Sequence, residues 1–333
     1  MSNSQTSNNN FPITTSENTA VIELPERLSV LEAVDFKNTC HQLLEGNHIP
    51  TQIVLDFDKT GFIDSSAIGA LIHNLKATKE KQVELVLSNV HSPVMAVLSM
   101  TGLDSIFTIN AKFEQDSKSK ARTSDKDLPE THPSIRSWVK RSLDIVGSIV
   151  GLIITGILFF PLAIAIKMDS PGPIFFGQTR CGWMGKRFRI WKFRSMCNDA
   201  EQLKSQITNE AVGAIFKNEN DPRITKVGNF LRRTSLDELP QFWNVLKGEM
   251  SLVGTRPPTP DEVETYEVPE WQRLDVKPGM TGEWQVNGRS NVKNFEDVIK
   301  LDLRYQRNWS LLYDVQLILK TISILFRKNS GAV

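Results

Sequence analysis

The chain has 333 residues, of which 40% are hydrophobic and 23% are charged, so it is long enough and apolar enough to fold into two domains. The net charge of +1 conceals an asymmetry, because residues 1–110 carry 6 Lys/Arg against 12 Asp/Glu and the remainder carries 33 against 26, which suits a phosphate, pyrophosphate or lipid-surface partner for the second part. Nucleic acid and zinc are not expected as partners, since no nucleic-acid-binding motif accompanies the basic charge and the three cysteines have no paired spacing (Cys40, Cys181 and Cys197).

Residues 1–18 are rich in Ser, Asn and Thr, and this composition predicts a disordered tail. The tail has no apolar stretch of the kind a signal peptide needs, so we expect the chain to start in the cytoplasm. The following residues alternate between short apolar runs and helical patterns, which predicts a small α/β domain with a mixed sheet over residues 19–110. The expected strands are 21–24, 53–57, 83–87 and 106–109, and the expected helices are 30–44, 66–79 and 93–100.

The turn after the second expected strand reads Phe62-Ile63-Asp64-Ser65-Ser66-Ala67-Ile68-Gly69. With this turn, residues 19–110 resemble a STAS domain, the fold of anti-sigma-factor antagonists. The resemblance implies that a partner kinase phosphorylates Ser65, because a helix start offers free N–H groups to a phosphate. The alternative is that Asp64 and Ser65 only cap the helix. No nucleotide-binding loop occurs here, so we expect a regulatory or docking module.

Residues 111–134 are charged and polar, and they predict a flexible linker. Beyond it, residues 145–166 form a stretch of about 22 residues without a charge, which is long enough to span a bilayer. Pro161 interrupts the stretch, and basic residues flank both ends, so the positive-inside rule favours two cytoplasmic ends. We therefore expect a re-entrant membrane helix over residues 135–168, with a plain spanning helix as the alternative.

Two adjacent carboxylates, Asp237 and Glu238, lie between a basic run and Pro240. Neighbouring residues on a helix point about 100° apart, so this pair cannot share one proton as two facing carboxylates would. One carboxylate is suited to chemistry and the other to holding a metal or orienting its partner. A solvated pair in the first turn of a helix is the alternative interpretation.

Further motifs surround this pair in a fixed order. They are Lys192–Met196, Asp221–Thr225, Asn244–Pro257, Val276–Gly282 and Gln285–Arg289. Together they resemble the catalytic domain of the monotopic phosphoglycosyl transferases, the bacterial sugar transferase family, from about residue 135 to the C-terminus. The resemblance implies an α+β membrane-associated catalytic domain over 169–333, preceded by a re-entrant helix whose break falls here at Phe160-Pro161.

Transfer of a phosphosugar to a lipid phosphate needs cations for the pyrophosphate, a nucleophile and a metal. A carboxylate such as Asp237 can form an acyl phosphate and split one transfer into two. Glu238 offers an oxygen ligand to Mg²⁺, the expected cofactor. The candidate phosphate-binding cations are Lys192, Arg232, Arg256 and Arg289.

The family resemblance assigns the same roles: Asp237 as nucleophile and Glu238 as its metal-binding neighbour, with Lys192, Arg232 and Arg289 on phosphate and nucleotide. The family's Gly-Pro-Arg-Pro is replaced by Gly254-Thr255-Arg256-Pro257. The implied reaction transfers a sugar 1-phosphate from a UDP-sugar to undecaprenyl phosphate and begins exopolysaccharide or other surface glycan synthesis.

The expected location is the inner membrane, with both domains on the cytoplasmic face. The expected partners are a kinase, phosphatase or anti-sigma-like protein at the STAS domain and a second copy in a homodimer. The alternative function is a membrane-tethered STAS signalling protein with an inactive transferase half. Residues 294–325 predict a helix at the lipid interface or in the core, with Trp309 and Tyr313 among its aromatic residues.

Overall fold

The computed structural model describes most of the chain, namely residues 11–16, 18–46, 48–110, 131–203, 206–210, 218, 220–287 and 294–325. The chain divides into two compact units. The first unit comprises residues 1–131 together with the short segments 184–186 and 266–275. The second comprises residues 132–183, 187–265 and 276–333.

A five-stranded mixed sheet forms the base of the first unit, with the strand order β1-β2-β4-β6-β7. Strand β1 (Ile13–Ser16) pairs antiparallel with β2 (Thr19–Glu23). The remaining neighbours are parallel, and they are β4 (Gln52–Asp56), β6 (Glu84–Ser88) and β7 (Thr108–Asn110). Parallel neighbours need a crossover connection, which explains why helices alternate with these strands in the sequence.

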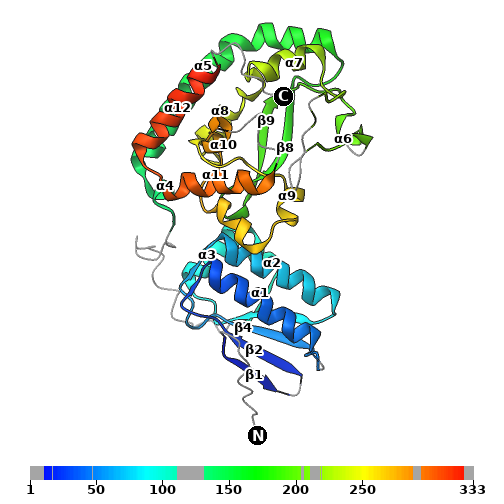
Figure 1. Cartoon of the computed structure of the whole chain (residues 1–333), viewed down its shortest axis with the longest axis vertical. Helices are drawn as coiled ribbons and strands as arrows, with labels where there is room; N and C mark the ends of the chain where they lie inside the picture. The colour runs from blue at the N-terminus through cyan, green and yellow to red at the C-terminus, as the bar shows by residue number, and fades with distance from the viewer. Residues whose placement is uncertain are drawn as a thin grey trace. The chain divides into compact units, whose positions relative to one another are not determined.

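Three helices make these connections: α1 (Val30–Glu45), α2 (Ser65–Glu80) and α3 (Ser92–Thr101). Helices α1 and α2 pack side by side (Figure 1). Helix α3 ends at Gly102, whose φ of 76° is left-handed and therefore favours glycine. Two short strands, β3 (Arg27–Leu28) and β5 (Phe62–Ile63), pair in parallel outside the main sheet. The predicted α/β domain with a mixed sheet is confirmed.

The first strand lies inside the stretch predicted to be a disordered tail, so that prediction is wrong for residues 11–16. Phe11 is buried, and its ring meets Phe36 of α1 edge-on at 6.4 Å between centroids. The strand register places Ile13 opposite Ile22. Backbone pairing with β2 and the burial of Phe11 stabilise this edge strand. The polar composition of the tail gave no sign of either contact. Residues 1–10 lie outside the described residues.

The predicted linker also ends earlier than expected, because α4 (Pro133–Arg136) begins before residue 134. A ring nitrogen of His132, just before α4, lies 3.0 Å from the carbonyl oxygen of Gln306. Residues 111–130 of the linker lie outside the described residues.

The second unit contains one long helix, α5 (Trp138–Asp169), which is long and apolar enough to cross a membrane by length and composition. One side of α5 is buried and polar or small, at positions spaced three to four residues apart: Lys140, Asp144, Ser148, Gly151 and Thr155. The opposite side exposes large apolar residues, including Val146, Ile149, Val150, Ile153, Ile157, Phe160 and Ile164. This arrangement reverses the pattern of a helix in water and favours contact with lipid.

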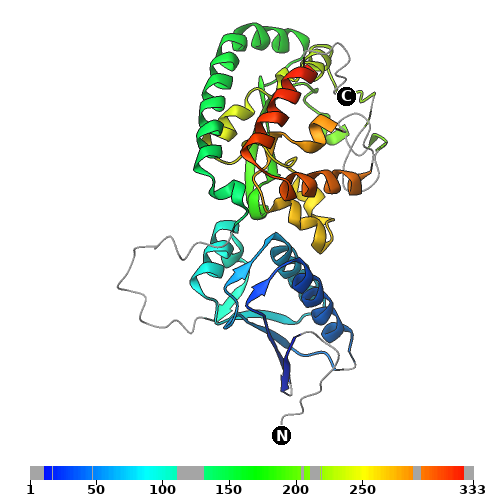
Figure 2. The ribbon, with the colours of Figure 1, turned by 60° about the vertical axis from the view of Figure 1, so that its left-hand side comes forward.

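Helix α5 bends in its second half, as Figures 1 and 2 show. Pro161 lies inside the helix and has no N–H group to donate to the carbonyl four residues earlier. The Thr155 hydroxyl donates to the Gly151 carbonyl oxygen (2.7 Å), a contact that also favours helix bending. Beyond the bend, Leu162 and Ile166 pack with Phe193 and Leu231. This bent apolar helix is compatible with the predicted re-entrant helix.

Short elements complete the α+β second unit. Strands β8 and β9 form an antiparallel hairpin, whereas β10 and β11 are parallel. The bounds are β8 (Phe175–Cys181), β9 (Arg187–Phe193), β10 (Ser251–Val253), β11 (Gly279–Thr281), α6 (Ala200–Leu203), α7 (Lys226–Arg233), α8 (Gln241–Lys247), α9 (Pro260–Glu264), α10 (Glu283–Asn287), α11 (Phe295–Arg307) and α12 (Leu311–Leu325).

The single helix predicted over residues 294–325 is two helices, α11 and α12. The helix is interrupted at residues 308–310. There the Ser310 hydroxyl accepts the N–H of Tyr313 and helps to start α12. Helix α12 buries Asp314 and Leu317 but exposes Leu312, Val315, Leu319 and Ile322. One side of the helix therefore belongs to the core, and a position at the lipid interface stays a prediction for the other side.

Gly151 of α5 allows close packing against α8, which yields a first prediction. A Cβ atom at Gly151 would lie 2.4 Å from the Phe242 ring, whereas one at Gly156 would meet nothing within 4 Å. Gly151→Ala should therefore destabilise the protein by about 1–3 kcal/mol through overpacking. Gly156→Ala is the matched control and should not destabilise it. Unfolding in detergent, monitored by tryptophan fluorescence, checks both, and equal stability of the two variants would contradict the packing argument.

Candidate active site

Asp237 and Glu238 lie in a short 3₁₀ helix, η5 (Leu236–Glu238), between α7 and α8. Ser235 precedes it with a left-handed φ of 55°, a strained value for a residue with a side chain. Asp237 is only 5% exposed, so it is not a solvated surface carboxylate. Asp237 does lie in a first helical turn, but the interpretation as a solvated pair does not describe it.

Lys192 of β9 holds the second carboxylate. Its ammonium nitrogen lies 2.9 Å from Oε1 of Glu238, and both side chains remain about a quarter exposed (28% and 24%). An ion pair that is open to solvent can exchange partners, so both groups can turn to an incoming phosphate or metal. The structure thus brings two of the predicted site residues together although 46 residues separate them.

Arg232, in the last turn of α7, faces the carboxylates. Its Nε donates to the hydroxyl of Ser195, at 3.1 Å. Burial lowers the pKa of Arg232, and the negative charge of nearby Asp237, more than that of Asp221 or Glu238, opposes this shift. The guanidinium remains charged, because even a lowered arginine pKa stays far above neutral. A partly buried cation near a buried carboxylate is suited to receive a phosphate that approaches that carboxylate.

The motif at residues 221–225 folds back on the motif at residues 192–196. The Thr225 N–H donates to the Ser195 carbonyl oxygen (3.2 Å), and that of Cys197 to the Arg223 carbonyl oxygen (2.8 Å). A Cβ atom at Gly228 would lie 1.9 Å from the Ser195 carbonyl oxygen, so this close approach requires glycine. The two motifs therefore form one structural element.

A buried ion pair stabilises this element. Arg223 Nη2 lies 2.6 Å from Oδ2 of Asp221, and its Nε donates to Oδ1 at 2.9 Å. Although burial acts to raise the pKa of Asp221, the hydrogen bonds and the charge of Arg223 hold it below its usual value. The backbone around Ser195 and Arg232 is thus fixed by a charge pair that the sequence motif alone did not reveal.

Arg256 differs from Lys192 and Arg232 in its surroundings. The guanidinium of Arg256 makes two contacts with the Glu262 carboxylate, at 2.8 and 3.0 Å. Glu262 is buried and also accepts the N–H of Thr259, which caps α9. Arg256 therefore has a carboxylate partner that the sequence reasoning missed, and Arg289 lies outside the described residues.

The carboxylate pair lies next to the bend of the apolar helix. Leu236 and Leu239, which flank the pair, pack in the same cluster as Leu158, Phe159 and Leu162 of α5. The hydroxyl of Thr155 also lies 3.4 Å from the Leu239 carbonyl oxygen. The residues on both sides of the carboxylate pair thus pack in one cluster with the helix that would meet lipid.

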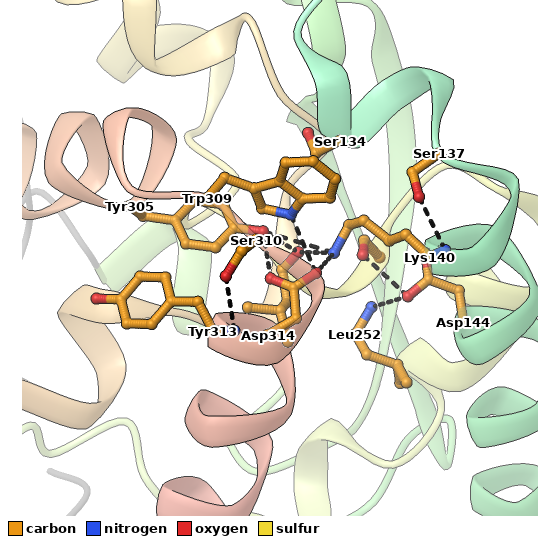
Figure 3. Close-up of polar contacts among 12 residues, drawn as sticks. Ser134, Ser137, Lys140, Asp144, Leu252, Tyr305, Trp309, Ser310, Tyr313 and Asp314 are labelled. Atoms are coloured by element: carbon orange, nitrogen blue, oxygen red, sulfur yellow. Dashed lines mark hydrogen bonds and ion pairs between the residues drawn. The ribbon is translucent and has the colours of Figure 1, made fainter.

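The start of α5 is fixed by a polar network that no sequence motif predicted (Figure 3). The ammonium group of Lys140 lies 2.6 Å from Oδ2 of Asp314 and donates to the Val253 carbonyl oxygen at 3.0 Å. Tyr305 and Trp309 also donate to the Asp314 carboxylate, at 2.9 and 3.2 Å. Burial, and then the charge of Asp314, raise the pKa of Tyr305 well above its usual value, so the phenol stays protonated and able to donate.

The next two charged residues on α5 strengthen this anchor. One carboxylate oxygen of Asp144 accepts the Ser251 hydroxyl and the Leu252 N–H, both at 2.9 Å (Figure 3). Arg141 donates to the carbonyl oxygens of Val245 and Leu246, at the end of α8. The available sequence signal was charge at the start of an apolar helix, because such residues usually face protein rather than lipid.

Arg194 fixes the other end of α5. Its guanidinium donates to the carbonyl oxygens of Ser170 (2.6 Å) and Pro171 (2.9 Å), just after the helix ends. Asp169, the last residue of α5, accepts the N–H of Val227 at 2.9 Å. The residues that follow Lys192 and the helix that carries Arg232 are therefore tied directly to the end of the apolar helix.

The donor set fits a metal only in part. Among the residues that the structure describes, no group of three or more His, Cys, Asp or Glu side chains could hold an ion by itself. Mg²⁺ commonly takes one or two carboxylates and completes its shell with phosphate oxygens and water. Glu238, with Asp237 beside it, matches that description. The site fits an ion that arrives with a pyrophosphate better than a resident ion.

Comparisons with known proteins match both parts of the chain. Residues 135–328 match the family described as bacterial sugar transferase, and residues 10–116 match the STAS domain. The galactosyl transferase CpsE of Streptococcus agalactiae is 52% identical over 188 residues, which are 56% of this chain and 42% of that protein.

Two further relatives differ in how much of their length is matched. The UDP-glucose:undecaprenyl-phosphate glucose-1-phosphate transferase of Escherichia coli is 43% identical over 196 residues, 56% of this chain and 40% of that protein. The exopolysaccharide production protein ExoY of Rhizobium meliloti is 37% identical over 204 residues, 59% of this chain and 90% of that protein. The chain thus spans about two fifths of the first two relatives and nearly all of ExoY.

Proposed function

Because the chain belongs to the bacterial sugar transferase family and carries an N-terminal STAS domain, we propose that it transfers a sugar 1-phosphate from a UDP-sugar to undecaprenyl phosphate. The printed name of the Escherichia coli relative describes this reaction with glucose, and that of ExoY describes exopolysaccharide production. We place the product at the first step of a surface glycan.

One observation carries the proposal: Asp237 is buried near the cation Arg232, and its neighbours Leu236 and Leu239 pack against the bent apolar helix. A carboxylate at that place is near both an anion-binding group and a surface suited to lipid. The alternative, a signalling protein with an inactive transferase half, is not favoured, because it gives no reason to keep a buried carboxylate near a partly buried cation.

The proposed reaction has two steps. The Asp237 carboxylate forms a bond to the phosphorus that bears the sugar, and the bond from that phosphorus to the bridging oxygen breaks, releasing UMP with the electron pair. An oxygen of undecaprenyl phosphate then attacks the same phosphorus and returns the carboxylate. Arg232 and Lys192 neutralise the phosphate charge. Glu238 would hold Mg²⁺, which would supply positive charge for the phosphate oxygens.

The test is a donor screen with the purified full-length chain in nanodiscs that contain undecaprenyl phosphate. UDP-glucose, UDP-galactose and their N-acetylated forms are supplied separately, and UMP and lipid-linked sugar are measured. We expect one donor or a small group of donors to give the two products in equal amounts. Failure of all four donors to yield lipid-linked sugar would refute the proposed function for these sugars.

We propose further that the STAS domain regulates this activity through Ser65, from a position on the cytoplasmic face of the inner membrane. Asp64 caps α2 through the N–H of Ala67, at 2.9 Å, as the alternative interpretation of this turn expects. Capping and regulation are compatible, because a capped helix start is also where a phosphate finds N–H donors.

A further inference from the structure

A segment from within the sugar transferase match packs on helices α1 and α2 of the first unit. It consists of residues 266–275 and contains the short helix η6 (Val268–Leu274). The Trp271 indole covers Gly69 of α2, where an added Cβ atom would lie 2.6 Å from the ring. A glycine is therefore required at this point of α2 for the indole to approach.

Polar contacts on both helices fix the same segment. Lys37 of α1 lies 2.7 Å from the Glu267 carboxylate. A ring nitrogen of His73 on α2 lies 2.8 Å from the Tyr266 carbonyl oxygen. Helix α2 contacts the segment at positions 65, 69 and 73, which are spaced by four residues. These positions therefore lie on one side of the first half of the helix.

Ser65, the first residue of α2, contacts the last residue of the segment. One carboxylate oxygen of Asp275 accepts the N–H of Ser65 at 2.9 Å, and the Ser65 hydroxyl lies 3.2 Å from the sulfur of Met184. Ser65 has no exposed surface. Asp64 occupies the neighbouring N–H of Ala67, so two carboxylates already hold the start of α2.

The negative charges of Asp64 and Asp275 are destabilised where they bind the start of α2. Burial raises the pKa of Asp64 to about 6, and burial followed by the charge of Asp64 raises that of Asp275 to about 7. The negative charge of Glu32 also raises the pKa of Asp64, to a smaller extent. A further negative group here would meet like charges in a buried environment, where repulsion is strong.

One buried group also points to a contact that can open. The indole N–H of Trp271 is buried and has no acceptor among the residues that the structure describes. An unmet buried N–H costs about 1–3 kcal/mol, and such groups are uncommon in permanent cores. Release of the segment would return this N–H to water, which favours a contact that can exchange.

We infer that α1 and α2 of the STAS domain form a protein-binding surface whose resident partner is the chain's own segment 266–275, and that a negative charge on Ser65 displaces this segment. A phosphoryl group brings a charge of about −1.5 to −2 to a site already held by Asp64 and Asp275. The segment directly precedes the motif at residues 276–282 of the sugar transferase part. Displacement of the segment by a charge on Ser65 would therefore act on this motif through the covalent connection of the chain. This inference deepens the proposed regulation and does not depend on the chemistry at Asp237.

Hydrogen exchange of the full-length chain in nanodiscs tests the inference, with the amides of residues 266–275 as the readout. Ser65→Asp should accelerate their exchange by tenfold or more, whereas Ser65→Ala should leave it near wild type. The amides of β4 report whether the STAS fold itself is intact. Unchanged exchange in Ser65→Asp, or equal acceleration in Ser65→Ala, would overturn the inference.

A rescue variant isolates charge from packing. Asp275→Asn keeps a carbonyl oxygen for the Ser65 N–H but removes an ionisable carboxylate, which with a pKa of about 7 is about half ionised at neutral pH. Combined with Ser65→Asp, it should restore most of the protection of residues 266–275. If Ser65→Asp also exposes β4, this double variant decides the question, since no recovery would count against the charge argument. The readout requires no sugar transfer, so failure of the proposed function would leave this result unaffected.

Discussion

Asp237→Asn is expected to lower the formation of lipid-linked sugar by about 10³-fold or more, and UMP release with it. The amide has nearly the size of the carboxylate but lacks the negative charge that attacks phosphorus. Because Asp237 is buried beside Arg232, another carboxylate cannot readily take its place. UMP release and radiolabelled lipid product, measured with the donor that the screen identifies, check this prediction.

A trapping experiment separates covalent catalysis from simple charge loss. Wild-type protein mixed with a donor labelled in its sugar, without lipid phosphate, should retain about one label per active site, and Asp237→Asn should retain none. Asp261→Asn is the matched control, because Asp261 is exposed in the first turn of α9, and it should behave as wild type. Full turnover by Asp237→Asn would end the proposal of an aspartyl intermediate.

Lys140→Met should cause the largest loss of stability among substitutions at the start of α5. Lys140 and Asp314 are an ion pair with side chains 8% and 4% exposed, so removing the cation leaves a buried carboxylate. Breaking such a pair costs about 3–5 kcal/mol, although the hydrogen bonds from Tyr305 and Trp309 would retain part of the stabilisation. Denaturant unfolding in detergent micelles provides the measurement.

The double variant Lys140→Met/Asp314→Asn should recover a large part of this loss. The amide needs no cation and still accepts a hydrogen bond from Tyr305 or Trp309. Lys300→Met is the control, since Lys300 forms an exposed pair with Asp297 and should change stability by less than about 1 kcal/mol. Wild-type stability in the single Lys140 variant would show that the pair does not anchor the helix.

Both ends of the apolar helix are tied to parts of the chain that form or support the site. Arg194 binds the carbonyl groups after α5 and lies two residues beyond Lys192, while Lys140 and Asp144 bind β10 and α12 at the start. If α5 met lipid on its exposed side, a change in its depth or tilt would move Arg194, β10 and α12, which are bonded to its two ends. In the proposed function, this geometry would keep the site for the lipid phosphate near lipid without a separate binding domain.

Local patterns in the sequence predicted much of this protein. Strand and helix periods gave the first domain, and an uncharged apolar run with Pro161 indicated one bent helix. The motif order around Asp237 and Glu238 indicated the family. These features depend on neighbours a few residues apart, which is the range over which side-chain periodicity, proline and helix caps act.

Other features followed only from tertiary structure. The partners Lys192–Glu238, Lys140–Asp314 and Ser65–Asp275 are 46, 174 and 210 residues apart in sequence, and no local pattern selects them. Phe11 was concealed by its polar surroundings, and Arg256 gained Glu262. The sequence by itself therefore determined most of the elements, though not β1 or the break between α11 and α12, and which residues are candidates for chemistry. Which carboxylate is buried and which cation it meets were decided by chain packing, because burial and charge pairing depend on distance in space.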